Sequence, residues 1–167
     1  PGDTVDALVA MNPAALATNI GDLRPGGILI ANSDAFDAKG LEQARYKTNP
    51  LEDGSLKSYR VHSVDMTKLT RGAVEGLGLS VKESDKCRNF FAMGLVFWLY
   101  DRPLEPTLRF IDEKFGRKVE VAQANTAALK AGYHYGETVE AISTQFHVPK
   151  AKLAPGKYTS IVGNTAL

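Results

Sequence analysis

The stretch DALVAMNPAALATNIGDLRPGGILIAN, residues 6–32, decides the fold class. It opens with an almost unbroken apolar run at residues 6–11, which is typical of a buried strand in a parallel sheet. Asn12 and Pro13 follow at once, and because Asn is a favoured N-cap and Pro a favoured first helical residue, we expect a helix through residue 23. The segment RPGG at 24–27 should end that helix, and residues 28–31 form a second buried strand closing on Asn32. The pattern predicts a βαβ unit with a right-handed crossover.

The pattern beyond this unit extends the sheet and then becomes helical. Residues 59–64 alternate as a strand does, and a helix should follow them through residue 74, capped by Asp65 or Thr67. Gly76 and Gly78 supply its C-terminal stop. Helical spacing predicts one long helix over residues 84–99 and three further helices at 41–45, 105–115 and 119–135. We therefore expect an α/β, Rossmann-like three-layer domain with a parallel sheet, helices on both faces and a helical C-terminal part.

Composition narrows the class of protein. With 167 residues, 44% hydrophobic and 23% charged, the chain reads as one soluble globular domain. The net charge is +1 and Lys and Arg are not clustered, so neither nucleic acid nor a membrane surface is an expected partner. Cys87 is the only cysteine, which excludes an internal disulfide and favours a reducing compartment, the cytoplasm.

Both ends of the sequence look interrupted, so we expect a fragment. The first residue is Pro1, not an initiator Met, and the last residues carry neither a helix stop nor a polar tail. Prolines, lysines and a loss of apolar periodicity mark residues 148–157. These features predict a domain at 1–146 and a linker at 147–167.

Several common kinds of site are not indicated by any motif. No Gly-x-Gly-x-x-Gly follows a strand, which argues against bound NAD or FAD. His62, His134 and His147 lie far apart, without other residues at metal-ligand spacing, so we interpret them as surface or hydrogen-bonded structural residues. Cys87 falls on an apolar helix face and is expected to be packed, not reactive. No catalytic residue is assigned.

Two groups of residues remain as candidate ligand contacts. Asn12 and Asn32 end adjacent predicted strands, where open α/β sheets form ligand crevices, although helix capping and turn formation would equally explain them. Lys86, Arg88 and Asn89 fall in the first turns of the predicted helix at 84–99, where free N–H groups and added positive charge suit an anion. The alternative is that these cations pair with the acidic side chains at 83 and 85.

The apolar residues of the same predicted helix indicate a possible interface. They cover so much of its circumference that one modest domain should not bury them all, and some are expected to meet a partner domain or subunit. The set comprises Phe90, Phe91, Leu95, Trp98 and Leu99.

Specific motifs link the chain to a known family. NFFAMGLVFWLYDRPL at 89–104 resembles the gamma domain of 2-oxoacid:acceptor oxidoreductases, particularly the 2-oxoglutarate type. The resemblance runs from about residue 5 to residue 140 with the motifs in the family's order. The other motifs that match the family are VAMNPAA at 9–15, NPL at 49–51, AN at 124–125, ALKAGY at 128–133 and YGET at 135–138.

The resemblance implies a part of the alpha subunit of a larger enzyme. Residues 1–146 would be the gamma domain without its N-terminal strand and Gly-rich loop, and 147–167 would lead into a thiamine-pyrimidine domain. The family oxidises a 2-oxoacid with coenzyme A (CoA) to acyl-CoA and carbon dioxide, using thiamine diphosphate, Mg²⁺ and a [4Fe-4S] cluster, and passes the electrons to ferredoxin. The fragment itself would hold none of these cofactors and would be inactive alone.

In such a complex the implied partners are the remaining alpha-subunit domains and a beta subunit that carries thiamine and the cluster. The gamma domain would contribute to the CoA side, which makes Asn12, Asn32, Lys86, Arg88 and Asn89 the candidate contacts. Two alternatives stay open at this point: a module for interaction only, and an autonomous α/β domain that binds a small molecule.

Overall fold

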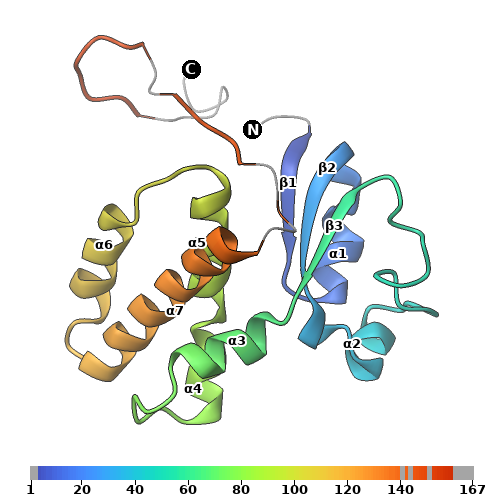
Figure 1. Ribbon diagram of the computed structural model, residues 1–167, viewed down its shortest axis with the longest axis horizontal. Coiled ribbons are helices and arrows are strands. Elements are labelled where there is room, and N and C mark those ends of the chain that lie inside the picture. Colours follow the sequence, from blue (N-terminus) through green and yellow to red (C-terminus); the bar gives the residue numbers. More distant parts are fainter. Residues whose placement is uncertain (1–3, 140–141, 143–144, 150–151, 160–167) are drawn as a thin grey trace.

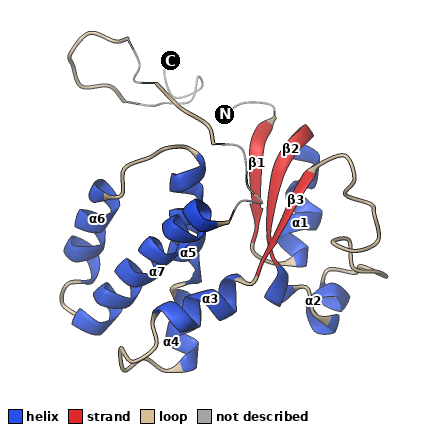
Figure 2. Ribbon diagram, viewed as in Figure 1, coloured by secondary structure: helices blue, strands red, loops and turns tan. Residues whose placement is uncertain are grey.

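The structure is a computed structural model that describes residues 4–139, 142, 145–149 and 152–159. Its centre is a parallel sheet in the order β1-β2-β3, with helices on both faces (Figures 1 and 2). Helices α1 and α2 cover one face, while α3, α5 and α7 lie on the other, as predicted. The strands are β1 (Val5–Ala10), β2 (Leu23–Asn32) and β3 (Arg60–Val64), and the helices are α1 (Pro13–Asn19), α2 (Ala38–Gln43), α3 (Met66–Ala73), α4 (Val81–Lys86), α5 (Arg88–Leu99), α6 (Glu105–Phe115) and α7 (Val119–Thr138).

The predicted βαβ unit is confirmed, but its helix is shorter than expected. The Asn12 side chain accepts a hydrogen bond from the Ala15 N–H at 2.8 Å, and α1 begins at Pro13. A 3-10 turn, Ile20–Asp22, then leads into β2, which begins at Leu23. The prediction that residues 24–27 end a helix was wrong, because Leu23 already pairs with Val5 and the register then shifts to the Ala7–Ile28 pair.

Alternate residues of the central strand, β2, belong to two different hydrophobic clusters. Ile28 and Ile30 belong to a cluster with buried residues of α3, α5 and α7. Leu29 and Ala31 belong to the opposite cluster, which includes Leu16 of α1. This alternation follows from the two-residue period of a strand and explains why β2 is buried on both faces.

The single helix predicted over residues 84–99 is two helices in the structure. Ser80 starts the first of them, with a capping box in which its hydroxyl accepts from the Glu83 N–H and the Glu83 carboxylate accepts from the Ser80 N–H. Cys87 ends this helix, α4, with an N–H bond to the Ser84 carbonyl, and α5 begins at Arg88. The strong cap before residue 84 accounts for the earlier start.

Helices α5 and α7 pack at very short range through glycines. A Cβ on Gly94 would lie 2.0 Å from the Leu129 carbonyl oxygen, and a Cβ on Gly132 would lie 1.9 Å from the Phe91 carbonyl oxygen. Only hydrogen side chains fit between these two backbones. The glycines therefore fix the distance between the helices, and with it the position of α5.

Most of the five apolar residues predicted as a possible interface on α5 are buried within the chain itself. Phe91, Leu95 and Leu99 are buried. Phe90 and Trp98 are half-buried; Phe90 meets Phe115 edge to face, with centroids 6.0 Å apart, and Trp98 packs over Gly136. The predicted partner contact is thereby reduced to the exposed parts of Phe90 and Trp98. Within the described residues, no helix is long and apolar enough to cross a membrane.

Candidate functional site

A polar hollow lies where β2 ends. Asn32, the last residue of that strand, is fully buried. Its side-chain amide donates to the Met11 carbonyl at 3.3 Å and to the Thr67 hydroxyl at 3.4 Å, while its Oδ1 has no hydrogen-bond partner among the described residues. Asn32 therefore ties the ends of β1 and β2 to the first turn of α3.

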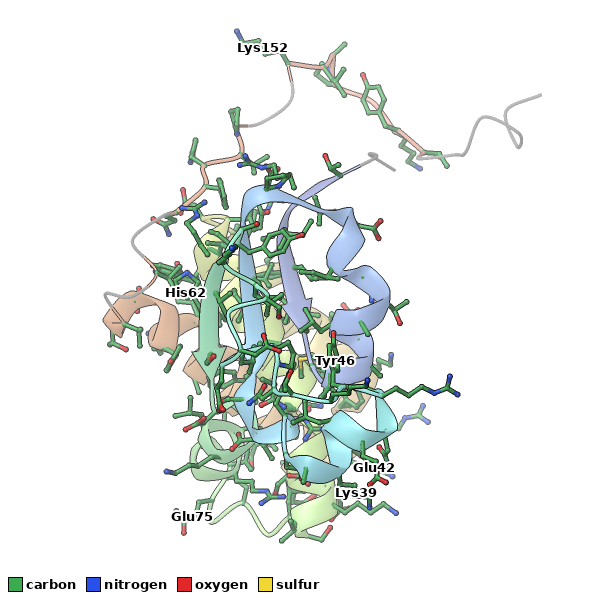
Figure 3. All side chains as sticks on the ribbon, turned by 90° about the vertical axis from the view of Figure 1, so that its right-hand side faces the viewer. Lys39, Glu42, Tyr46, His62, Glu75 and Lys152 are labelled. Atoms are coloured by element: carbon green, nitrogen blue, oxygen red, sulfur yellow. The ribbon has the colours of Figure 1, made fainter. Side chains whose placement is uncertain are left out.

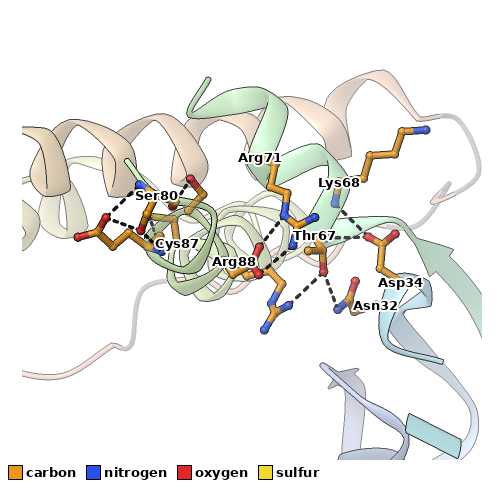
Figure 4. A network of polar contacts seen from close by, with 11 residues as sticks. Asn32, Asp34, Thr67, Lys68, Arg71, Ser80, Cys87 and Arg88 are labelled. Atoms are coloured by element: carbon orange, nitrogen blue, oxygen red, sulfur yellow. Dashed lines mark hydrogen bonds and ion pairs between the residues drawn. The ribbon is translucent and has the colours of Figure 1, made fainter. Parts of the chain in front are cut away.

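Arg88 continues this chain of contacts from the other side. Its Nη1 donates to the Thr67 hydroxyl at 3.2 Å, and its Nε is buried without a partner in the described structure. Figure 4 shows the resulting line from Asn32 through Thr67 to Arg88. Asn32 and Arg88, two of the five predicted contact residues, are thus linked through Thr67. Thr67 was predicted only as a possible helix cap.

A cavity of about 410 Å³ opens beside this line, between α3, α4, α5 and the loop after β2. The Asp34 carboxylate accepts hydrogen bonds from the backbone N–H groups of Thr67 at 2.9 Å and Lys68 at 3.0 Å. Asp34 thereby caps α3, and its negative charge is stabilised by the N–H groups at the start of that helix.

The second carboxylate of the cavity, that of Asp85, forms an ion pair within the protein. Arg71 donates to Asp85 through Nε at 2.7 Å and Nη2 at 2.9 Å, a two-point ion pair between α3 and α4. The Arg71 hydrogen bond holds the pKa of Asp85 below its usual value, and the nearby charge of Arg88 acts in the same direction. Asp85 therefore stays ionised and is poorly suited to proton transfer near neutral pH.

Two cations remain in the cavity without an ion-pair partner among the described residues, Arg88 and Lys68. The alternative that Arg88 pairs with Asp85 is not observed as a contact, because Arg71 takes that carboxylate. The planar guanidinium of Arg88 suits a phosphate or carboxylate group, and Lys68 adds positive charge to the cavity although its side chain extends away from Arg88 (Figure 4). The arrangement can bind an anion, and it lacks the nucleophile–base pair that a catalytic site needs.

Arg88 and Asn89 are the first residues of α5, as the helix-terminus argument for the anion site expected, but the argument fails for Lys86. Lys86 is the last residue of α4, not a first-turn residue of a long helix. At the start of α5, the N–H groups of Phe90 and Phe91 both donate to the Cys87 carbonyl. The case for an anion therefore rests on the side chains of Arg88 and Lys68 and no longer on free N–H groups.

The other predicted contacts lie apart from this cavity. Asn12 caps α1 and faces a separate hollow shared with α2. Lys86 lies at the edge of a different cavity, between α4, α5, α6 and α7, and does not pair with Glu83, whose carboxylate bonds to Ser80. Asn89 is exposed and makes no hydrogen bond with another described side chain. Only Asn32 and Arg88 share one site.

The histidines have the ordinary roles expected of them. His134 pairs with Glu137 and His147 with Asp101 on the surface. His62 lies on the outer strand β3 (Figure 3), where burial and then the charge of Arg60 lower its pKa. No three metal-ligating side chains come together in the described part of the chain.

Cys87 is packed, as expected. The side chain is 3% exposed and belongs to the core, and burial raises the pKa of its thiol. A thiol that stays protonated is a poor nucleophile and a poor metal ligand.

Sequence reasoning missed Asp34 and Lys68, which line the cavity together with Thr67. A signal was available, because Ser33-Asp34 directly follows the buried strand that ends in Asn32. A carboxylate at that position can cap the next helix of a parallel sheet. The contact still depends on how far the loop folds back over α3, which spacing does not encode.

Comparisons with known proteins were made for the whole chain. The family model described as pyruvate ferredoxin/flavodoxin oxidoreductase matches residues 1–135. The chain is 56% identical over 166 residues to the 2-oxoglutarate oxidoreductase subunit KorA of Mycobacterium tuberculosis, an alignment covering 99% of this chain and 25% of that protein. It is 20% identical over 179 residues to the alpha subunit of 2-oxoacid:ferredoxin oxidoreductase 2 of Aeropyrum pernix, covering 91% and 26%. The chain thus spans about a quarter of the length of these curated relatives.

A solved structure shares the fold. It is 2-oxoglutarate:ferredoxin oxidoreductase from Magnetococcus marinus with 2-oxoglutarate, coenzyme A and succinyl-CoA bound. The TM-score is 0.62 at 18% identity, and the match covers 90% of this chain and 23% of that chain. At this identity the likeness bears on the α/β architecture alone.

Proposed function

Since the chain belongs to the pyruvate ferredoxin/flavodoxin oxidoreductase family, we propose that it is the gamma domain of the alpha subunit of a 2-oxoglutarate:ferredoxin oxidoreductase. The observation that carries this proposal is the 56% identity to a 2-oxoglutarate oxidoreductase subunit along 99% of the chain. In this proposal residues 1–146 form the domain and 147–167 form the linker to a thiamine-pyrimidine domain. The enzyme converts a 2-oxoacid and CoA to acyl-CoA, carbon dioxide and reduced ferredoxin, in the cytoplasm.

The residues of this chain do not fit the redox cofactors of such an enzyme. A [4Fe-4S] cluster needs several cysteine thiolates, and the chain has one cysteine, which is buried. The described residues also bring together no group of carboxylates that could hold Mg²⁺ with thiamine diphosphate. In this proposal thiamine diphosphate, Mg²⁺ and the cluster are held by other domains of the alpha subunit and by the beta subunit. This chain takes part in binding and assembly.

We assign the cavity of Arg88 and Lys68 to the CoA side of the assembled enzyme. CoA carries phosphates, and both cations of the cavity lack an ion-pair partner among the described residues. Asn32 and Thr67 hold the Arg88 guanidinium in place from behind, so that it is oriented before a ligand arrives. A charge-assisted hydrogen bond of this kind contributes roughly 1.5–3 kcal/mol.

Steady-state kinetics of the complete enzyme test the assignment. Replacing Arg88 with Ala should raise the KM for CoA about tenfold or more, and the KM for 2-oxoglutarate should hardly change. The matched control is Asn89→Ala, which alters the neighbouring exposed residue and should leave both constants as they are. An unchanged CoA constant in a folded Arg88→Ala enzyme would reduce Arg88 to a surface charge. Equal effects on both substrates would indicate a damaged subunit interface.

A further inference from the structure

A second cavity lies on the side of α5 away from the sheet and has a different chemical character. It is about 290 Å³ in volume and is lined mainly by apolar side chains of α5, α6 and α7. Phe90 and Phe115 form one wall, with their rings edge to face, and Leu79 and Val121 complete the apolar lining. This volume is at the small end of ligand cavities, which run from about 300 to 1,000 Å³.

One polar side chain points into this apolar space. Asn125, in the second turn of α7, lines the cavity and is 4% exposed. Its amide makes no hydrogen bond with any described residue. The sealed polar atoms without a partner in the described structure belong to Asn32, Thr70 and Arg88, so the Asn125 amide is open to the space of the cavity. Asn125 is free to donate to and accept from a group placed in the cavity.

The mouth of the cavity is positively charged. Lys86, at the end of α4, and Lys118, which precedes α7, both lie at its edge and form no ion pair with a described carboxylate. Glu83 also lines the cavity, so the net charge of its charged lining residues is positive by one, and the Glu83 carboxylate accepts from the N–H and hydroxyl of Ser80. Both lysines lower the pKa of Glu83 less than those hydrogen bonds do. The two ammonium groups can therefore receive an added anion.

We propose that this cavity is a binding site for a small organic acid that has an aromatic or branched apolar body, an amide in its middle and a carboxylate at its end. The apolar body fills the space between Phe90 and Phe115, the amide pairs with Asn125, and the carboxylate lies between Lys86 and Lys118. The site is separate from the cavity of Arg88, because the two cavities share no lining residue. It goes beyond the proposed function and does not depend on it.

Three related probes separate the contributions of the cavity. Hippurate has a ring, an amide and a carboxylate; 4-phenylbutyrate keeps the ring, the chain length and the charge but lacks the amide; hippuramide keeps the amide but lacks the charge. Saturation-transfer NMR titrations on the complete enzyme measure the dissociation constant of each. We expect hippurate to bind about tenfold more tightly than 4-phenylbutyrate, because only hippurate satisfies Asn125. Hippuramide should bind several-fold more weakly than hippurate.

Variants then locate the binding. Asn125→Leu should abolish the preference for hippurate over 4-phenylbutyrate, while Asn89→Leu, at an exposed position of α5, should leave it intact. The double change Lys86→Ala and Lys118→Ala should bring hippurate and hippuramide to similar affinity. Val121→Trp, which fills the cavity from another wall, should block all three probes.

The stability of Asn125→Leu distinguishes a ligand site from a structural Asn. Leu has the same branched arrangement of four side-chain heavy atoms, and the change removes no hydrogen bond to a described residue, so the variant should melt at about the same temperature as the wild type. A marked fall in melting temperature would show that Asn125 supports the fold, and the proposal would be overturned. It would also be overturned by equal hippurate affinity in Asn125→Leu, by loss of hippurate binding in Arg88→Ala, or by no saturation transfer at millimolar hippurate.

Discussion

Gly132 is the position where one added methyl group should have the largest effect on this fold. In α7 its Cα faces the backbone of α5, and a Cβ there would lie 1.9 Å from the Phe91 carbonyl oxygen and 2.7 Å from the carbonyl carbon. A carbon and a carbonyl oxygen ordinarily approach to about 3.3 Å. For Gly132→Ala, the two helices would have to separate locally by roughly 1.4 Å. Neither partner atom belongs to a side chain that could rotate away.

Two opposing contributions set the size of the effect. Alanine in a helix interior is favoured over glycine by about 0.8–1.0 kcal/mol. Overpacking of a tight core typically costs about 1–3 kcal/mol and occasionally more, and contact with rigid backbone belongs at the upper end. We therefore expect Gly132→Ala to lower the free energy of unfolding by about 2 kcal/mol. For a chain of this length the melting temperature should fall by roughly 4–8 °C.

Urea unfolding followed by circular dichroism measures this change directly. Gly72→Ala is the matched control, because Gly72 lies in α3 with nothing within 4 Å of an added Cβ. That variant should be as stable as the wild type or more stable by up to about 1 kcal/mol. If Gly132→Ala were as stable as Gly72→Ala, the helices would not be held at the distance described, and glycine could not be the reason for their close approach.

Two further predictions concern α4. Ser80→Ala removes the hydroxyl of the capping box and should lower the free energy of unfolding by about 1 kcal/mol in urea titrations. Ser58→Ala, at an exposed loop position whose hydroxyl bonds to no described residue, should have little effect. Because the fold lowers the pKa of Asp85, its ionised form should stabilise the protein above the unfolded carboxyl pKa, and this stabilisation should be lost as the pH falls through the lowered value. The urea midpoint of Asp85→Asn should therefore depend less on pH between about 6 and 3 than the midpoint of the wild type. An equal dependence would contradict the pairing of Asp85 with Arg71.

Long apolar runs and strong helix boundaries made most of the fold predictable. The first two strands could be located because a buried parallel strand needs several consecutive apolar residues, as at residues 28–31, and the third because residues 59–64 alternate. The bounds of α6 were predicted correctly at Glu105 and Phe115, between Pro103 and Gly116. The family resemblance stated from the motifs is confirmed by the match over residues 1–135. Local chemistry alone was enough for these features.

The errors occurred where tertiary contacts decide between local alternatives. The start of β2 at Leu23 depends on its pairing with Val5, a partner distant in sequence. In the same way, Asn32 and Arg88 share a site only because Thr67 lies between them. Helical spacing could place Arg88 near a helix start, but it could not show that Arg71 would occupy Asp85 and leave Arg88 unpaired.

The buried face of helix α7 serves for packing and also contains the residue on which the proposed binding site rests. Its buried face includes Asn125, Leu129, Gly132 and Gly136, which recur at intervals of three or four residues. From spacing alone this is a packing face, and Gly132 is indeed used for packing against the backbone of α5. Asn125 interrupts the pattern with an amide whose hydrogen bonds are unused within the described chain. The proposed binding site rests on this residue, which lies seven positions, about two helical turns, before Gly132 and its close approach to the backbone of α5.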